Sequence, residues 1–144
     1  SLDDPLSKMS KSAENPLSRI SLLDDDAKIK KAIMKSTTDS EGSVRHDQEQ
    51  KPGISNLLNI YSAFSGLPVA EIEKRYEGAG YGTFKKDLVE VAISALTPIR
   101  ERYQEIRHSA ELRAALNGGA ERAGAIAART MARVKERFGL GSGN

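Results

Sequence analysis

The chain has 144 residues, of which 38% are hydrophobic, and its 22 basic and 20 acidic residues leave a formal net charge of +2. This length allows one compact domain, and the near balance of charge argues neither for nor against a nucleic-acid partner. The absence of cysteine excludes disulfides, thiolate metal sites and cysteine nucleophiles. No apolar run approaches the roughly 20 residues that span a bilayer, so we expect no membrane partner and a cytoplasmic location.

Near its beginning the chain carries a short basic and hydroxyl-rich string, Lys8–Ser12, which reads Lys-Met-Ser-Lys-Ser. The pairs Asp4-Pro5 and Asn15-Pro16 flank it, and because proline fixes its own φ and disfavours helix at the preceding residue, they predict a loop with two stiff ends. Two ammonium groups, hydroxyls and backbone N–H groups on one loop suit the binding of a polyphosphate. The alternative for such a composition is an ordinary solvated loop.

Beyond residue 23 the apolar residues recur at spacings of three and four, and no segment shows the period of two that is typical of strands. The sequence therefore predicts an all-α fold, a bundle of about five helices preceded by an irregular loop. We expect a first part over residues 1–23, a helical domain over 24–139 and a disordered tail over 140–144. The helical segments, some of them short, are expected at 24–35, 52–65, 68–77, 83–108, 109–117 and 120–138.

Three consecutive aspartates, Asp24 to Asp26, open the first of these helices. Carboxylates stabilise the positive end of the helix dipole, so this run predicts an N-cap. A magnesium site is the alternative, but neighbouring side chains on a helix diverge, and we predict no metal site. Further along, Pro98 interrupts the longest helix; because the apolar stripe continues in phase beyond it, we predict a kink rather than a break.

The polar segment between residues 36 and 51 is predicted to be an exposed excursion with little regular structure, turning at Gly42. His46 and Asp47 lie side by side in it and cannot easily share a proton, so His46 is interpreted as a surface histidine. The glycine-rich stretch 78–82 lacks the preceding strand of a phosphate-binding loop. It is therefore interpreted as a tight turn between helices.

The last two segments are expected to be separated by a helix stop at Asn117-Gly118-Gly119. One face of the final helix is apolar and is predicted to pack in the core; its residues are Ala123, Ala127, Met131, Val134 and Phe138. A second face carries four arginines at offsets of seven, four and four, which are Arg122, Arg129, Arg133 and Arg137. This arginine stripe is the candidate for phosphate contacts with a nucleic acid, and a solvated charged face is the alternative.

The Lys8–Ser12 string resembles the signature of class I aminoacyl-tRNA synthetases, and residues 38–45 and 51–62 resemble the tryptophanyl members of that class, of bacterial or organellar type. The resemblance runs from Ser1 to about Gly141. Members of the family begin with a nucleotide-binding α/β domain, which carries a His-x-Gly-His-type motif and the tryptophan pocket, and neither occurs in this sequence. The resemblance thus implies the C-terminal part of a synthetase, with residues 1–23 left from its catalytic domain, and the chain alone is expected to be inactive.

The resemblance also implies a function. Such an enzyme activates tryptophan with ATP, accompanied by Mg²⁺, to tryptophanyl-adenylate and pyrophosphate, and then transfers it to tRNA(Trp); it works as a homodimer without a bound prosthetic group. Its signature loop binds ATP through residues that correspond here to Lys8, Met9, Ser10, Lys11 and Ser12. Lys8 and Lys11 would carry the catalytic charge, and the helical domain would meet the anticodon arm. A stand-alone helical tRNA-binding module and a tyrosyl-type enzyme are the alternatives.

Overall fold

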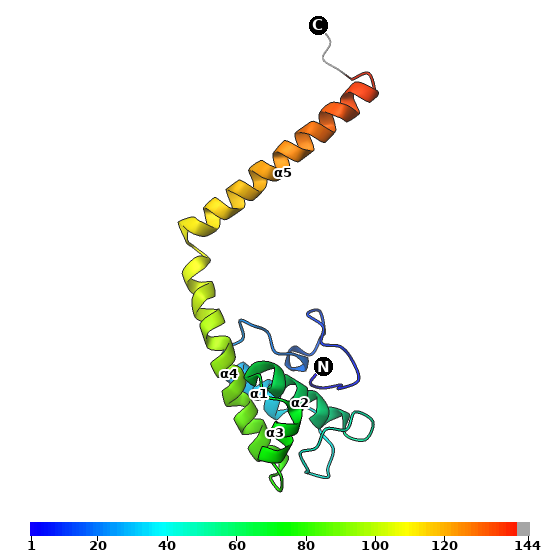
Figure 1. Cartoon of the computed structure of the whole chain (residues 1–144), viewed down its shortest axis with the longest axis vertical. Helices are drawn as coiled ribbons and strands as arrows, with labels where there is room; N and C mark the ends of the chain where they lie inside the picture. The colour runs from blue at the N-terminus through cyan, green and yellow to red at the C-terminus, as the bar shows by residue number, and fades with distance from the viewer. Residues whose placement is uncertain (141–144) are drawn as a thin grey trace. The chain divides into compact units, whose positions relative to one another are not determined.

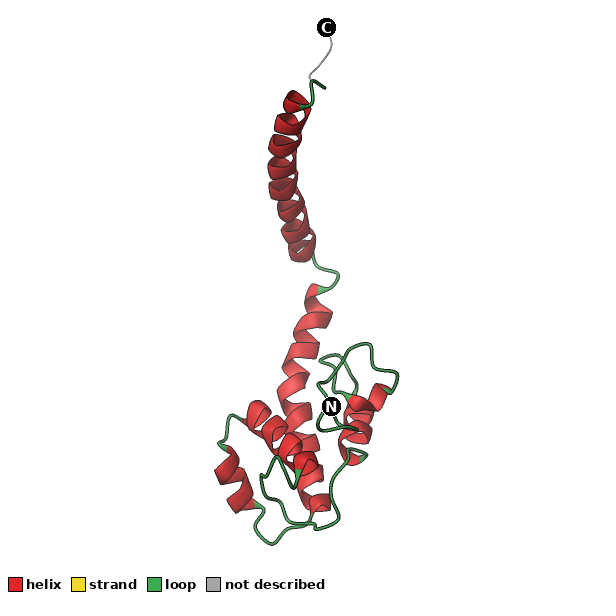
Figure 2. Ribbon diagram, turned by 90° about the vertical axis from the view of Figure 1, so that its right-hand side faces the viewer, coloured by secondary structure: helices red, strands yellow, loops and turns green. Residues whose placement is uncertain are grey.

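The computed structural model describes residues 1–140, and within them every regular element is a helix (Figures 1 and 2). The all-α prediction is confirmed for this part of the chain. Of the tail predicted to be disordered, only Leu140 is described, and it is exposed; residues 141–144 lie outside the described part. The elements are the 3-10 helix η1 (Pro16–Ser18) and the α-helices α1 (Asp26–Met34), α2 (Pro52–Ser65), α3 (Val69–Arg75), α4 (Tyr81–Ile106) and α5 (Ala110–Arg137).

The chain divides into two compact units. The first is Ser1–Glu101, which holds the signature loop, η1, α1 to α3 and most of α4. The second begins at Arg102 and contains the last residues of α4 and all of α5. The functional division expected between residues 23 and 24 stays a prediction. In the structure, the loop and the first helices share one unit.

The core of the first unit is built from the apolar stripes that the helical spacing predicts. Three aromatic rings lie at its centre: Phe84 of α4 is 5.8 Å from Tyr61 and 5.1 Å from Tyr76, measured between ring centroids. Leu2, which precedes the signature loop, is 1% exposed and belongs to the same core. The other apolar residues that α1, α2, α3 and α4 bury there are Ile29, Ala32, Ile33, Ile54, Leu57, Leu58, Ile72, Leu88, Val89, Ala92 and Leu96.

The predicted start of α1 is confirmed, because Asp25 is its N-cap and accepts a hydrogen bond from the N–H of Lys28 at 2.7 Å. The neighbouring carboxylates go elsewhere: Asp24 pairs with the ammonium of Lys28 at 2.5 Å, and Asp26 pairs with Arg100 at 2.7 Å. The three carboxylates are thus used separately. This arrangement follows the capping interpretation for Asp25.

The other helix ends follow the predicted punctuation. Pro52 begins α2, and Gly66, with φ of 74°, ends it in the left-handed conformation that glycine adopts without strain. The turn between α3 and α4 passes through Gly78 at φ 75°, as predicted. Helix α4 continues through Pro98, which excludes a break at that residue; the kink stays a prediction.

The prediction of a helix stop at Asn117-Gly118-Gly119 is wrong. α5 is continuous over 28 residues, Ala110–Arg137, and Ser109 is its N-cap. Each glycine in a helix interior costs about 1 kcal/mol relative to alanine. Strong helix formers, mainly Ala, Glu and Arg, surround the pair on both sides and carry the helix across it.

The predicted core face of α5 is also wrong. None of its residues is buried, and Met131, Val134 and Phe138, which the pattern placed in a core, are 50%, 37% and 76% exposed. An apolar stripe indicates which face of a helix can pack against a partner, but it does not show that a partner element is present. The described part of the second unit offers no other helix beyond the end of α4 to provide it.

Candidate functional site

The signature loop, residues 4–15, extends from the core of the first unit on a closed stem. The backbone N–H of Leu2 donates to the carbonyl of Ser18 at 2.8 Å, so the two ends of the loop meet. The carbonyl of Leu2 accepts from the N–H of Thr37 at 2.8 Å on its other side. Because Leu2 is buried in the core, the loop departs from a fixed point.

At both Asx-proline pairs, predicted to be the stiff ends of the loop, the Asx side chain forms a turn with the backbone. The carboxylate of Asp4 accepts from the N–H of Leu6 at 3.2 Å and from the hydroxyl of Ser7. At the other end, the Asn15 side chain accepts from the N–H of Leu17 at 3.0 Å and donates to Asp3 at 2.7 Å. Such side-chain bonds mimic a backbone turn and hold the chain without helix or sheet.

The two lysines of the loop are exposed, and within residues 1–140 neither Lys8 nor Lys11 makes a hydrogen bond or an ion pair. Their serine neighbours contact one another, with the hydroxyls of Ser10 and Ser12 3.1 Å apart. Met9 is partly buried and packs against the core. The loop is therefore anchored through one apolar side chain and presents two unpaired cations to solvent, a charge arrangement suited to a polyphosphate.

Arg19 follows the loop in sequence and binds its backbone. The sequence alone did not indicate this role. The Nη1 of Arg19 donates to two loop carbonyls, those of Ser10 at 3.4 Å and Ala13 at 3.2 Å. The pairing of an arginine with backbone carbonyls leaves no sequence signal, because any residue supplies a carbonyl. The guanidinium therefore stabilises the C-terminal half of the loop, although Arg19 lies outside the Lys8–Ser12 string.

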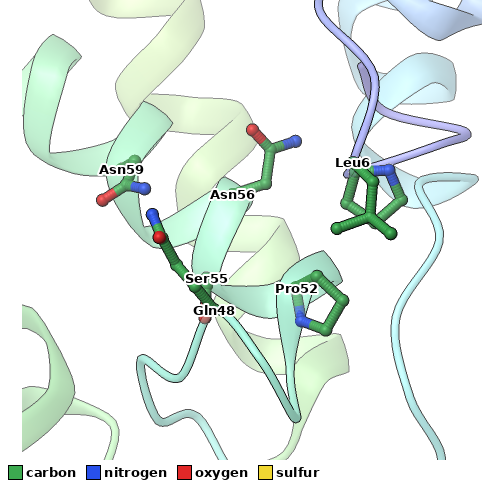
Figure 3. A pocket seen from close by; sticks show the side chains of 7 residues that line it. Leu6, Gln48, Pro52, Ser55, Asn56 and Asn59 are labelled. Carbon is green, nitrogen blue, oxygen red and sulfur yellow. The ribbon is translucent and has the colours of Figure 1, made fainter.

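A polar cavity of about 290 Å³ lies between the first limb of the loop and α2 (Figure 3). Pro5 and Leu6 form the loop side, and the amide side chains of Gln48, Asn56 and Asn59 face it from the other elements. Asn56 already donates to the carbonyl of Ser1 at 2.9 Å. This cavity has no motif in the sequence, since its lining comes from three separate segments.

The polar segment from residue 36 to 51 has no regular helix, as predicted, but the expectation that it is simply exposed is wrong. Lys51, at its end, is 1% exposed. Its Nζ lies 3.2 Å from Asp39, 3.1 Å from Glu41, 3.1 Å from the carbonyl of Ser43 and 2.9 Å from the hydroxyl of Tyr81. A buried charge requires partners, and these four oxygens fold the segment around the ammonium.

The ionisation of this cluster follows from its contacts. Burial alone would lower the pKa of Lys51, but the hydrogen bonds to Tyr81, Glu41 and Asp39 outweigh it and raise the pKa above its usual range. Burial opposes ionisation of Asp39 too, yet the bonds from Tyr81, the Glu41 N–H and Lys51 hold the pKa of this carboxyl below its ordinary value. Lys51 and Asp39 are therefore both charged at neutral pH, and their ion pair stabilises the fold of this segment.

His46 is half-buried rather than fully at the surface, and its neighbour Asp47 has other partners. Asp47 accepts from Arg45 at 2.9 Å and from the N–H of Gln50 at 3.0 Å, so its carboxylate does not pair with His46. The backbone N–H of His46 donates to the Glu73 carboxylate at 2.5 Å. These contacts do not form an acid-base dyad.

The arginine stripe lies along α5 in the second unit, and all four of its side chains, Arg122, Arg129, Arg133 and Arg137, are exposed. Within the described residues, the ion pairs of this unit involve Arg102 and not the stripe. The four guanidinium groups are thus available for an anionic partner. No helix in residues 1–140 combines the length and apolarity that a membrane crossing needs.

Comparison with known proteins shows which family the chain matches. The family model described as tRNA synthetases class I (W and Y) matches residues 1–97. The tryptophan–tRNA ligase of Bacillus anthracis is 51% identical over 140 residues, covering 97% of this chain and 43% of the relative. That of Bacillus subtilis is 49% identical over 141 residues, covering 98% and 43%.

The solved structure of tryptophanyl-tRNA synthetase from Mycoplasma pneumoniae is similar over 98% of this chain and 43% of its own, with a TM-score of 0.74 and 32% identity. The chain thus spans less than half the length of the relatives it matches. The matched family region includes the signature loop, its stem and α1 to α3. The chain belongs to the class I tRNA synthetases of the tryptophan and tyrosine group, and along nearly its whole length it is similar to their tryptophanyl members.

Proposed function

We propose that this chain is part of an enzyme that activates tryptophan with ATP and transfers it to tRNA(Trp). The tryptophan carboxylate attacks the α-phosphorus of ATP and pyrophosphate leaves. A hydroxyl of the terminal tRNA ribose then attacks the carbonyl of the adenylate, which forms the aminoacyl ester and releases AMP. Neither step needs a covalent enzyme intermediate, so catalysis rests on positioning and electrostatic stabilisation. The family membership and the names of the relatives support this proposal.

The observation that carries the proposal is the pair of unpaired, exposed ammonium groups on an anchored loop. Lys8 and Lys11 neutralise the β- and γ-phosphates as negative charge develops on the leaving pyrophosphate. Ser10 and Ser12 add hydroxyl and backbone donors, and Met9 holds the loop against the core. Mg²⁺ accompanies the ATP as its counter-ion, and no prosthetic group is needed for this chemistry.

The test is Lys11→Ala in the full-length protein that contains this chain, with Lys30→Ala of α1 as the matched control, since Lys30 is also an exposed lysine. We expect Lys11→Ala to lower the rate of tryptophan activation in ATP–pyrophosphate exchange by about 100-fold or more, while ATP affinity changes much less, because the charge acts mainly in the transition state. Lys30→Ala leaves both quantities unchanged. Equal losses of rate and affinity in Lys11→Ala would count against the assignment.

For the second unit we propose contact between the arginine stripe and the phosphates of the tRNA anticodon arm. Each phosphate contact releases counterions, so the affinity for tRNA should fall steeply with salt. Changing the four arginines to Gln should weaken binding and flatten the salt dependence by roughly one unit of slope for each phosphate that is no longer neutralised. The control changes four other basic residues of the same unit to Gln: Arg102, Arg107, Arg113 and Lys135. If both quadruple variants behave alike, the stripe is an ordinary charged surface.

The remaining parts of the proposal concern the whole enzyme, which we place in the cytoplasm as a homodimer. Tryptophan rather than tyrosine is the proposed substrate, because the relatives reported above are tryptophan enzymes. A second function, a helical module that binds tRNA without catalysis, is favoured by one observation: the stripe lies in a compact unit of its own. Binding of this chain to tRNA(Trp), measured by fluorescence anisotropy against an anticodon-substituted tRNA, distinguishes the two. Only a self-sufficient module binds tightly and responds to the anticodon.

A further inference from the structure

The stem of the signature loop is bound by a residue that no motif singles out. Thr37, which follows α1, uses both of its donors on the stem: its N–H donates to the carbonyl of Leu2 at 2.8 Å, and its hydroxyl donates to the carbonyl of Asp3 at 2.8 Å. These two carbonyls belong to the residues just before the loop, and Lys8 follows only five residues after Asp3. The root of the loop is therefore attached to the segment Ser36–Thr38.

That segment is itself held from α4 by a buried lysine. The Nζ of Lys85 donates to the carbonyl of Ser36 at 2.8 Å and to the hydroxyl of Thr38 at 3.4 Å, one residue on either side of Thr37. Lys85 is 7% exposed and pairs with no carboxylate within residues 1–140. Burying an ammonium group without an opposite charge is costly, and an apolar side chain would fill the same space without that cost. The lysine is useful here as a donor that holds the two neighbours of Thr37, Ser36 through its backbone carbonyl and Thr38 through its side-chain hydroxyl.

Helix α2 also packs closely against the segment Ser36–Thr38. Gly53, in its first turn, lies so close that a Cβ atom built on it would be 2.3 Å from the carbonyl oxygen of Thr37 and 3.0 Å from the Cα of Thr38. The glycine is thus required by close approach of two backbones and not by an unusual φ. Next to it, Asn56 of α2 donates to the carbonyl of Ser1 at 2.9 Å.

We propose that Thr37 is a positioning residue for the signature loop: clamped between Lys85 and Gly53, it fixes the root about which Lys8 and Lys11 move onto the polyphosphate. This inference rests on the proposed function of the loop. A loop that closes on ATP and releases pyrophosphate needs a mobile tip and a fixed root, so that each closure returns the two ammonium groups to the same place. The exposed, unpaired lysines supply the tip, and the Thr37 bonds supply the root.

The test is Thr37→Val, which removes the hydroxyl with little change of shape, and Thr37→Ser, which keeps it. Thr97→Val is the matched control, because the Thr97 hydroxyl also donates to a backbone carbonyl, that of Ile93 at 2.8 Å, but within α4. In the full-length protein, Thr37→Val should lower kcat for ATP–pyrophosphate exchange about three- to tenfold, with KM for ATP changed less than about twofold. Thr37→Ser should restore kcat, and Thr97→Val should leave it unchanged.

A second readout follows the loop root without any catalysis. Trypsin cleaves after lysine, and cleavage of the 144-residue chain after Lys8 and Lys11 should be about two- to fivefold faster in Thr37→Val than in the parent or in Thr97→Val. Unchanged cleavage, an unchanged kcat, or a failure of Thr37→Ser to rescue would each overturn the positioning role. Lys11→Ala separates the two proposals: if it loses activity while Thr37→Val does not, the positioning inference fails alone, and if Lys11→Ala is fully active, the proposed function of the loop fails.

Discussion

The signature loop and the segment from residue 36 to 51 are both polar, irregular and rich in charge, but they use their lysines in opposite ways. In the loop, Lys8 and Lys11 are exposed and unpaired within the described chain. In the segment, Lys51 is 1% exposed and has four oxygen partners. The loop offers its charge to a ligand, whereas the segment uses its charge to hold its own fold.

The difference lies in how each region satisfies its backbone. The loop closes through side-chain turns at Asp4 and Asn15 and through Arg19, so its ammonium groups are not needed for structure. The segment also has a side-chain turn, in which Asp39 accepts from the N–H of Glu41 at 2.9 Å, but Lys51 then gathers Asp39 and Glu41 around one buried ammonium. Burial and partners, more than residue type, therefore separate a structural cation from an available one.

The largest expected effect comes from removing the buried cation. Lys51→Met removes the buried ammonium from Asp39, Glu41 and the Tyr81 hydroxyl, and breaking such an interaction typically costs about 3 kcal/mol. Lys8→Met, the same change at an exposed position, should alter the free energy of unfolding by less than about 0.5 kcal/mol. Urea unfolding of the 144-residue chain, followed by circular dichroism, measures both. Equal stability of the two variants would remove the distinction drawn between the two regions.

A second comparison uses two glycines in the first turns of helices. Gly53→Ala forces a Cβ against the Thr37 carbonyl and should destabilise the first unit by about 1–3 kcal/mol through backbone displacement. A Cβ atom placed on Gly82 of α4 would meet no atom within 4 Å, so Gly82→Ala should be neutral or stabilise by up to about 1 kcal/mol. The urea midpoints of the two variants should move in opposite directions. A stabilising Gly53→Ala would show that the segment is free to shift.

Much of the first unit was predictable from local signals. Apolar spacing indicated α2 and α4, Asp25 indicated the cap of α1, and Gly66 and Gly78 indicated two helix ends, because each of these features depends on neighbours a few residues away. The signature string indicated the loop by its composition. Its contacts with ATP are still predictions.

The features that the sequence did not indicate depend on residues far away in the chain, or on whether another element packs against a helix. Lys51 and Lys85 lie in polar or mixed surroundings along the chain, and their partners are up to 49 residues away, so neither pattern nor motif indicates that they are buried. Along α5 the sequence predicted features that the structure lacks. Gly118-Gly119 was predicted to end a helix, and the apolar face that includes Met131 was predicted to be buried. The strong helix formers on both sides of Gly118-Gly119 keep the helix continuous. An apolar stripe on a helix cannot show whether a partner is present to bury it.

An acid titration should sharpen the comparison by a smaller effect. The pKa of Asp39 is held below its ordinary value of 3.8, so its contribution to stability is complete above about pH 5 and is lost as pH falls through the lower value of the folded state. Asp39→Asn lacks this contribution. The urea midpoint of the parent should therefore fall more between pH 6 and pH 3 than that of Asp39→Asn. Parallel curves would mean that this carboxylate does not stabilise the segment.

The smallest effect is expected for the other buried lysine. Lys85→Met loses the hydrogen bond to the Ser36 carbonyl but also removes the cost of burying a charge, so stability at pH 7 should fall by less than about 1 kcal/mol. Burial lowers the pKa of Lys85, so the unfolded chain binds the proton more tightly and the parent should gain stability as pH rises towards 10. Lys85→Met cannot share that gain. The two urea midpoints, measured at pH 7 and pH 9.5, test this sign.

The same variant separates positioning from stability. Lys85 holds the backbone carbonyl of Ser36 and the hydroxyl of Thr38 on either side of Thr37, so its loss should loosen the root of the loop although it costs little free energy. Trypsin cleavage after Lys8 and Lys11 should accelerate in Lys85→Met, while in Lys8→Met, which is equally stable, cleavage after Lys11 should not. If Lys85→Met is both as stable and as resistant at Lys11 as the parent, the lysine is a tolerated buried charge, and the root of the loop depends on Gly53 and the Thr37 bonds alone.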